Sequence, residues 1–576
     1  LGGTQNQNLQ KKKDKMRKVN SSSVDASSLE PAQGTLVPTK ETLVRGLNAH
    51  TVLVLLCAIL GGLLFGLDIG TGSTVANDHF REAMGIPLMP DSGKDSSEAV
   101  GKTHQFTILF HVASLIGAPI AGQVADRFGR KSVIIAASLL FAAGGVWQAC
   151  AGMISSSFGW NSIVLGRIVG GLGNGFLLVI MPVYASELSP AHIRGKTITL
   201  FQLFITIGIF LMSVYNKAVE NVEWGWRLGF ALQSVPCAVV LVLALVVLPE
   251  SPRYLVTRNK VEQARAALVK LSSGNPNRDA IAEKELQEIV EEVAEIKAAG
   301  EGTFAELFRG NAFPALCCAV MVAFSQNITG VNWFMSYGPS LYNSLGFQPF
   351  LFDMINKGIN VVATIASLFV IDSFGRKFLT VWGTSLVILF FGVLCIMILA
   401  TGAQMNAPGD IATSTDKAAQ TFSVVMINVF QVVFAITWGP LGWLVPSEVF
   451  SIRNRGKGMS CAVIANMITN IVFGDYGYSA LYDATSFEGT IGILVLFNVV
   501  IVFTTVVFLQ PGTKGVSLED MRKVFAYEYD GNDELSHGTL RAFYRKNLGQ
   551  TMKIYTCRAV DPTDDFEQKP AVLTIL

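Results

Sequence analysis

The chain has 576 residues, of which 51% are hydrophobic and 15% are charged, and its mean hydropathy is +0.44. Soluble proteins carry about 25% charged residues, so this chain has too few polar groups to cover a water-facing surface of its size, and we expect a membrane protein. Its formal net charge of +1 gives no reason to expect nucleic acid as a partner.

Long apolar runs predict membrane-spanning helices, because about 20 apolar residues cross the hydrocarbon core of a bilayer. Twelve such runs follow one another at 50–72, 106–124, 132–153, 162–184, 197–217, 229–248, 314–342, 353–371, 378–402, 420–446, 458–480 and 489–509. A long polar segment after the sixth run divides them into six plus six. We therefore predict an all-α membrane protein with twelve transmembrane helices in two six-helix halves.

This pattern also predicts the domain boundaries. They are an N-terminal tail at 1–45, a first half at 46–249, a linker at 250–312, a second half at 313–512 and a C-terminal tail at 513–576. Charged residues among alanines and leucines at 258–299 predict amphipathic linker helices with a solvated face, and a partner site is the alternative. The tails are polar, and we expect them to be flexible.

Basic residues in short connections predict the orientation in the membrane. Alternate loops contain clusters of them, namely Arg127, Arg130 and Lys131, then Arg194 and Lys196, then Arg376 and Lys377, then Arg453, Arg455 and Lys457. We expect these loops, the linker and both termini to be cytoplasmic. The plasma membrane is the expected location, and an internal or plastid membrane is the alternative.

The two halves repeat short motifs at corresponding places. The pairs are DRFGRK at 126–131 with DSFGRK at 372–377, SEL and RGK at 186–196 with SEV and RGK at 447–457, and PESPR at 249–253 with PGTKG at 511–515. A duplication of six-helix units places a substrate site between the halves near the bilayer midplane, with alternating access by rocking of the halves.

These motifs carry a family resemblance. Together with GPLGWLVPSE at 439–448 and the Q-x-x-x-G-x-N stretch at 326–332, they resemble the sugar porter family of the major facilitator superfamily over residues 48–520. GPLGWLVPSE and QLFITIGI at 202–209 are most similar to plant and green-algal monosaccharide/proton symporters. The resemblance implies a transporter rather than an enzyme, which moves a hexose such as glucose, needs no cofactor and acts as a monomer.

Charged residues at the cytoplasmic ends of the spans form a candidate gate. Its members are Asp126, Arg130, Glu187, Arg194, Glu250, Arg253, Arg376, Glu448 and Arg455. Ion pairs that cross between the halves would hold the cytoplasmic side shut. The alternative is that these charges only set the topology, but the acidic residues recur in both halves and topology does not require them.

A full charge is rare inside the predicted spans, but Asp68 lies in the first span and Arg167 near the start of the fourth. Charges at membrane depth are costly and are usually paired and functional. Arginine stays protonated, so the carboxylate is the partner that can take up a proton. The resemblance implies the same role, because the position matching Asp68 is acidic in proton-coupled sugar porters and typically Asn in facilitators. The alternative is that Asp68 only neutralises Arg167.

A hexose needs amide groups for its hydroxyls and an aromatic surface for its ring. Residues of these kinds stand at positions that match sugar-contacting residues of the family, namely Phe65, Gln202, Gln326, Asn327, Asn332, Asn360, Trp443 and Asn466. Each amide could instead serve as a contact between helices. The chain departs from the family at Asn327, where a second Gln is usual, at Leu67, where Tyr is usual, and at Gly512, where Glu is expected.

The predicted function is therefore import of a monosaccharide together with protons by alternating access. A passive hexose facilitator shares the whole fold and is the first alternative, and a transporter-like sugar sensor is the second. No nucleophile–base pair, phosphate loop or metal cluster emerges from the sequence, so catalytic and metal sites are not expected.

Overall fold

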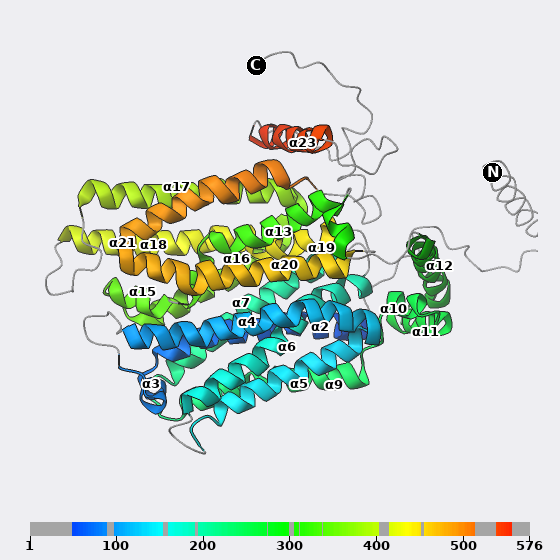
Figure 1. Cartoon of the computed structure of the whole chain (residues 1–576), viewed down its shortest axis with the longest axis horizontal. Coiled ribbons are helices and arrows are strands. Elements are labelled where there is room, and N and C mark those ends of the chain that lie inside the picture. Colours follow the sequence, from blue (N-terminus) through cyan, green and yellow to red (C-terminus); the bar gives the residue numbers. More distant parts are fainter. Residues whose placement is uncertain are drawn as a thin grey trace, which may run out of the picture. The chain divides into compact units, whose positions relative to one another are not determined.

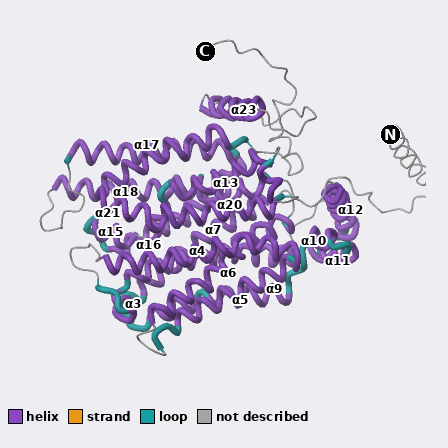
Figure 2. The backbone as a smooth tube through the Cα atoms, in the orientation of Figure 1, coloured by secondary structure: helices purple, strands orange, loops and turns teal. Residues whose placement is uncertain are grey.

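The structure is a computed structural model that describes residues 49–88, 97–153, 159–189, 194–273, 275–298, 304–309, 312–336, 338–402, 414–450, 454–512 and 537–555. Within these ranges every regular element is a helix (Figure 1, Figure 2). All of them belong to one unit, Arg45–Leu576. The predicted all-α class is confirmed for this part of the chain.

The first half contains both long helices and short ones. They are α2 (Ala49–Thr71), α3 (Asp78–Met84), α4 (Ser97–Phe128), α5 (Arg130–Ala149), α6 (Gly159–Leu188), α7 (Arg194–Ala218), α8 (Gly225–Leu232) and α9 (Ser234–Val246). Small residues let these helices approach closely: Gly66 and Gly208 bring α2 against α7, and a Cβ at Gly66 would lie 2.0 Å from the Ile205 carbonyl oxygen.

The predicted linker contains three helices, α10 (Pro252–Thr257), α11 (Val261–Leu271) and α12 (Arg278–Ala298). Their apolar sides pack on one another in a small separate cluster. The Thr51 hydroxyl donates to the Leu271 carbonyl at 2.6 Å, so α11 lies against the start of α2. Many charged residues on α12 are exposed, as the amphipathic pattern predicts.

The second half has a similar series of helices. They are α13 (Ala312–Ile328), α14 (Val331–Ser336), α15 (Gly338–Ser344), α16 (Pro349–Phe374), α17 (Arg376–Thr401), α18 (Ser414–Ile436), α19 (Trp438–Val449), α20 (Arg455–Thr469) and α21 (Tyr478–Phe497). The halves contact each other where α7 packs on α16 and α19 and where α4 packs on α20. Figure 1 shows these long helices side by side.

Ten helical segments in the described residues are long and apolar enough to cross a membrane, and they match ten of the twelve predicted runs. The runs 314–342 and 458–480 contain interrupted helices instead. Gly330, with a left-handed φ of 94°, separates α13 from α14, and a π-helical segment, Asn470–Gly477, follows α20. Both interruptions lie beside amide side chains that line the cavity described below, where irregular backbone can be satisfied by neighbouring helices.

The C-terminal tail differs from the flexible segment that we predict, because residues His537–Tyr555 form α23. This helix packs on the end of the second half. The Lys377 ammonium donates to the Asn547 carbonyl at 2.6 Å, and the Gly512 backbone N–H donates to Gln550 Oε1 at 3.1 Å. Polar composition predicts flexibility only when no surface offers such partners, and here the second half offers them.

Candidate functional site

A cavity lies between the two halves, and both amide and apolar side chains line it, as in sites for small polar molecules. Helices α2 and α7 line it from the first half, and α13, α14, α16, α18, α19 and α20 line it from the second. All eight residues predicted to bind substrate line this one cavity: Phe65, Gln202, Gln326, Asn327, Asn332, Asn360, Trp443 and Asn466. Residues from 65 to 466 in the chain thus converge on a single space.

Aromatic side chains form one wall of the cavity. The Trp443 ring is 5% exposed and meets the rings of Phe65 and Phe201 edge to face, with centroids 6.3 Å and 5.9 Å away. Edge-to-face contacts of this kind fix the plane of the indole. A fixed, buried indole face can pack against the apolar face of a flat ring.

A chain of amides forms another part of the wall. Gln326 donates to the backbone carbonyls of Trp438 and Gly439 at 3.2 Å and 2.9 Å and accepts from Asn466 at 3.1 Å. Gln326 therefore joins α13, α19 and α20 and fixes their approach.

The chain continues from Asn466 toward α14. Asn470 donates to Asn466 Oδ1 at 3.0 Å and accepts a hydrogen bond from Asn332. Asn332 also donates to Asn327 Oδ1 at 2.7 Å. Since each amide both donates and accepts, the wall can exchange internal bonds for bonds to the hydroxyls of a ligand.

Gln202 on α7 has bonding capacity left for a ligand. Its Oε1 is buried and has no hydrogen-bond partner among the described residues. A buried unsatisfied carbonyl oxygen is costly unless a ligand or water satisfies it. An acceptor aimed into a cavity between the halves is what recognition of a hydroxyl group requires.

Asp68 and Arg167 meet as a bidentate ion pair within the first half. Arg167 Nη1 contacts Asp68 Oδ1, and Arg167 Nη2 lies 3.3 Å from Asp68 Oδ2, with both residues 2% exposed. Arg167 also donates to the Phe106 carbonyl at 3.1 Å and lies 4.2 Å from the ring centroids of Phe106 and Phe110. These contacts hold the guanidinium in place independently of the carboxylate.

The residues of the ion pair line a second, smaller cavity that adjoins the first. Asp68, Arg167 and His111 line it from the first half, and Asn332 and Asn470 line it from the second. Because Asn332 and Asn470 line both cavities, the amide wall connects the charged pair to the larger space.

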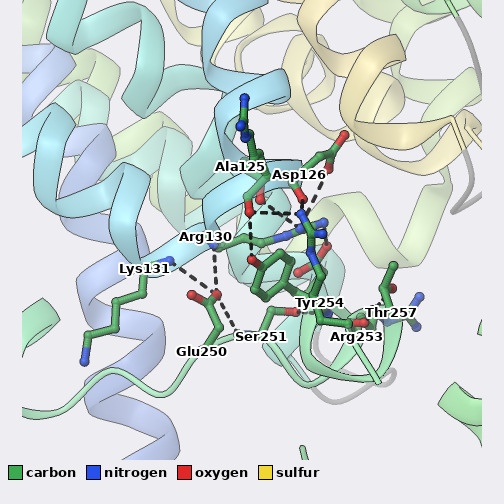
Figure 3. A network of polar contacts seen from close by, with 12 residues as sticks. Ala125, Asp126, Arg130, Lys131, Glu250, Ser251, Arg253, Tyr254 and Thr257 are labelled. Carbon is green, nitrogen blue, oxygen red and sulfur yellow. Dashed lines mark hydrogen bonds and ion pairs between the residues drawn. The ribbon is translucent and has the colours of Figure 1, made fainter. Parts of the chain in front are cut away.

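Polar groups gather where α4, α5 and α10 meet (Figure 3). Arg130 Nη2 contacts Glu187 Oε1 at 3.1 Å, and Arg130 Nη1 lies 3.7 Å from Asp126. Glu250 accepts hydrogen bonds from the backbone N–H groups of Arg130 and Lys131 at 2.8 Å and 3.3 Å, so it caps the start of α5.

Gly129 makes this cap possible. Its φ is 94°, and a Cβ at this position would lie 2.2 Å from Glu250 Oε2. Tyr254 and Arg258 of the linker donate to the Arg127 carbonyl at 3.1 Å and 2.9 Å, which satisfies the end of α4. In the first half, both the positive φ and the carboxylate that caps α5 therefore require glycine at position 129.

The second half repeats the Arg–Glu pair but not the capping acid. Arg376 contacts both carboxylate oxygens of Glu448, at 3.2 Å and 2.8 Å. At Gly512 the backbone binds Gln550 of α23 instead of providing a carboxylate. The helix from the C-terminal tail, α23, therefore provides the hydrogen-bond partners of Gly512 and Lys377 in the second half.

For the remaining predicted gate residues, the structure gives the helix to which each belongs. Arg253 lies in α10, Arg455 is buried at the start of α20, and Arg194 begins α7 with a side chain outside the described residues. The Arg130 and Arg376 pairs each lie within one half, whereas we expect pairs that cross between the halves. A crossing pair on this side stays a prediction.

Sequence reasoning missed Asn470, which belongs to both cavities. A signal was present, because Asn470 follows Asn466 by four residues and therefore shares its helix face. His111 beside the ion pair was also absent from the predicted site.

Comparison with known proteins identifies the family of this chain. Residues 54–525 match the family model described as "Sugar (and other) transporter". The chain belongs to this family of sugar transporters. It is an integral membrane transporter of the major facilitator superfamily, and not an enzyme.

Individual relatives cover most of the chain. H(+)/hexose cotransporter 2 of Parachlorella kessleri is 33% identical over 496 residues, covering 84% of this chain and 87% of the relative. Sugar transport protein 1 of Arabidopsis thaliana is 30% identical, covering 86% of this chain and 94% of the relative. A low-affinity glucose transporter of Saccharomyces cerevisiae is also 30% identical, covering 84% and 83%.

Among solved structures, the proton:xylose symporter XylE bound to 6-bromo-6-deoxy-D-glucose has a TM-score of 0.67 and 26% identity. The match covers 83% of this chain and 99% of XylE.

Proposed function

We propose that this sugar transporter imports a monosaccharide of the hexose class together with protons. The observation that carries the proposal is the buried Asp68–Arg167 pair, which opens into a cavity shared with the amide wall. The names of the algal relatives include a proton and a hexose, which supports the same proposal.

Proton uptake begins at Asp68. When the outer side is open, water reaches the smaller cavity and the carboxylate takes a proton. The neutral acid loses its ionic bond to Arg167, which stays charged and keeps its contacts to Phe106 and Phe110. The helices that carry the pair, α2 and α6, are then free to adjust around a bound sugar.

Sugar binding follows in the larger cavity. Gln202 accepts a hydroxyl hydrogen, the amide wall exchanges internal bonds for bonds to other hydroxyls, and Trp443 packs on the ring. Contacts from both halves to one ligand favour a state in which the halves close around it. After the inner side opens and the sugar leaves, Asp68 releases its proton and the ion pair reforms.

The cytoplasmic charge clusters have a supporting role in this cycle. Arg130–Glu187 and Arg376–Glu448 hold each half together at its cytoplasmic end. On this side the Ser460 hydroxyl lies 3.4 Å from the Ala118 carbonyl, so α20 and α4 touch across the halves. We place these ends, the linker and both termini in the cytoplasm of a protein that works as a monomer in the plasma membrane.

A passive hexose facilitator is the second candidate, because the yeast relative is named only as a glucose transporter and the larger cavity would serve either mechanism. Asp68 distinguishes the two. A facilitator has no need for a carboxylate at membrane depth, where charges are costly.

Uptake of radiolabelled glucose in cells that lack their own hexose transporters tests the proposal. We expect accumulation above the external concentration at acidic external pH and its loss on addition of a protonophore. Uptake that only equilibrates, and that ignores both the protonophore and external pH, would establish the facilitator. Absence of uptake for every monosaccharide tested would refute the proposal.

A further inference from the structure

A second buried ion pair lies in the second half, and neither of its residues is among those that line the two cavities. Lys357 Nζ contacts Asp353 Oδ2 at 2.7 Å within α16, and each residue is 1% exposed. The two are four residues apart, so they stack on one face of the helix. Neither residue belongs to the substrate or proton site described above.

The pair is bound by the first half. Lys357 Nζ also donates to the Ser73 hydroxyl at 3.1 Å, and the Ser213 hydroxyl donates to Asp353 Oδ2 at 2.9 Å. Ser73 follows the end of α2, and Ser213 lies near the end of α7. Each charge of the pair therefore has one hydrogen-bond partner across the boundary between the halves.

These contacts lie on the side opposite to the basic loops. Helices α2 and α7 end on this side, and α16 begins there. The other end of α16 lies at the basic motif DSFGRK, at 372–377. Gly338 at the start of α15 packs directly on the pair, since a Cβ at this position would lie 2.2 Å from Asp353 Oδ1. The pair is thus enclosed by α7, α15, α16 and the segment after α2.

A buried ion pair is stable only when its remaining hydrogen-bonding capacity is satisfied. Here part of that capacity is satisfied by the other half. Separation of the halves on this side would break both serine contacts and admit water to the charges. Closure excludes the water and restores the contacts, so the pair depends on the distance between the halves.

We propose that Asp353 and Lys357, with Ser73 and Ser213, form a latch that closes the extracellular side of the transporter. The proposal rests on the alternating access described under Proposed function. The charges neutralise each other inside the closed interface, and the serine hydroxyls make closure specific to one register of α16 against α7. Removal of one charge leaves the other buried and unpaired, which disfavours the closed state.

Accessibility of a reporter cysteine tests the latch. Gly72 lines the cavity beside Asp68, and a Cβ at this position meets no atom within 4 Å. Gly72→Cys is introduced into the whole chain, with its native cysteines replaced and with delivery to the cell surface retained. Intact cells are then treated with a membrane-impermeant methanethiosulfonate reagent in the absence of sugar.

We expect Lys357→Met to raise the rate of modification by at least about tenfold, since loss of one partner of a buried pair is strongly destabilising. The double variant Asp353→Lys with Lys357→Asp restores the pair and should return the rate to within about twofold of the parent, because serine hydroxyls serve either charge. Ser213→Ala should raise the rate by about threefold, as expected for one hydrogen bond.

Lys217→Met is the matched control. Lys217 forms a partly exposed pair with Glu220 at the same end of α7, within the first half, so its loss should leave the rate unchanged. The latch is refuted if Lys357→Met reaches the cell surface and is modified at the parent rate. If that variant does not reach the surface, the double variant Ser73→Ala with Ser213→Ala, which keeps both charges, decides by the same rule.

The labelling requires neither sugar nor a proton gradient. A parent protein that moves no sugar would therefore refute the proposed function and leave the labelling result readable. A transporting parent with unchanged labelling in the latch variants would refute the latch alone.

Discussion

The two halves of the molecule share the ion pairs beside their basic loops and differ in their most deeply buried ones. Arg130–Glu187 and Arg376–Glu448 repeat the same contact in both halves. In contrast, Asp68–Arg167 joins two helices of the first half beside a cavity, and Asp353–Lys357 lies within one helix and binds the other half. We therefore expect the repeated charges to stabilise each half, and we propose coupling and gating as the roles of the unrepeated ones.

The largest expected effect comes from removing the carboxylate that only the first half has beside a cavity. Asp68→Asn keeps a group that can contact Arg167 but cannot release a proton. We expect internal sugar to rise no higher than external sugar, with exchange of labelled for unlabelled sugar retained. Steady-state accumulation and counterflow measure the two quantities. Full concentrative uptake by this variant would contradict the role of Asp68.

A smaller effect is expected in the cavity that both halves share. Trp443→Ala removes the aromatic wall, and we expect the KM for sugar to rise about tenfold, which corresponds to about 1.4 kcal/mol. Trp443→Phe, the control, keeps an aromatic face and should retain most of the affinity. Equal KM values for the two variants would show that the ring is not a sugar contact.

The repeated pairs predict equal effects in the two halves. Arg130→Gln and Arg376→Gln each remove the arginine partner of a partly buried glutamate, and each should lower the free energy of unfolding by about 1 to 3 kcal/mol. Thermal unfolding of the purified variants measures this loss. Both variants should also raise the accessibility of cysteines placed on the cytoplasmic side. A loss in one half only would mean that the repeated motifs differ in role.

The smallest effect concerns the motifs at the ends of the two halves, where PESPR at 249–253 contains Glu250 and PGTKG at 511–515 has Gly512 instead. Gln550→Ala removes the partner of the Gly512 N–H, and we expect a loss of about 0.5 to 1.5 kcal/mol. Glu250→Gln removes a charge that caps α5 and should cost more. Comparison of the two melting temperatures checks this order. A larger loss for Gln550→Ala than for Glu250→Gln would contradict the expectation that the α23 contact stabilises the protein less than the Glu250 cap does.

Much of the fold and the site follows from one-dimensional patterns. Hydropathy predicts ten of the helices because length and composition are local properties. The amides at 326–332 and Trp443 converge on one cavity, as the family motifs predict. The interruptions at Gly330 and Asn470 escape prediction because an apolar run does not reveal where backbone geometry changes.

Other features depend on contacts between distant segments. The sequence analysis does not single out Asp353 and Lys357, because only the fold brings Ser73 and Ser213 of the other half to them. Likewise, α23 forms in a polar tail because Lys377 and Gly512 of the second half offer it partners.

The central claim is that protons enter with sugar through Asp68. The most direct measurement is the electrical current and the external pH during sugar addition to cells that express the protein. We predict a sugar-evoked inward current and alkalinisation of the medium for the parent protein, and neither for Asp68→Asn. Sugar uptake by the parent without any current or pH change would contradict the account.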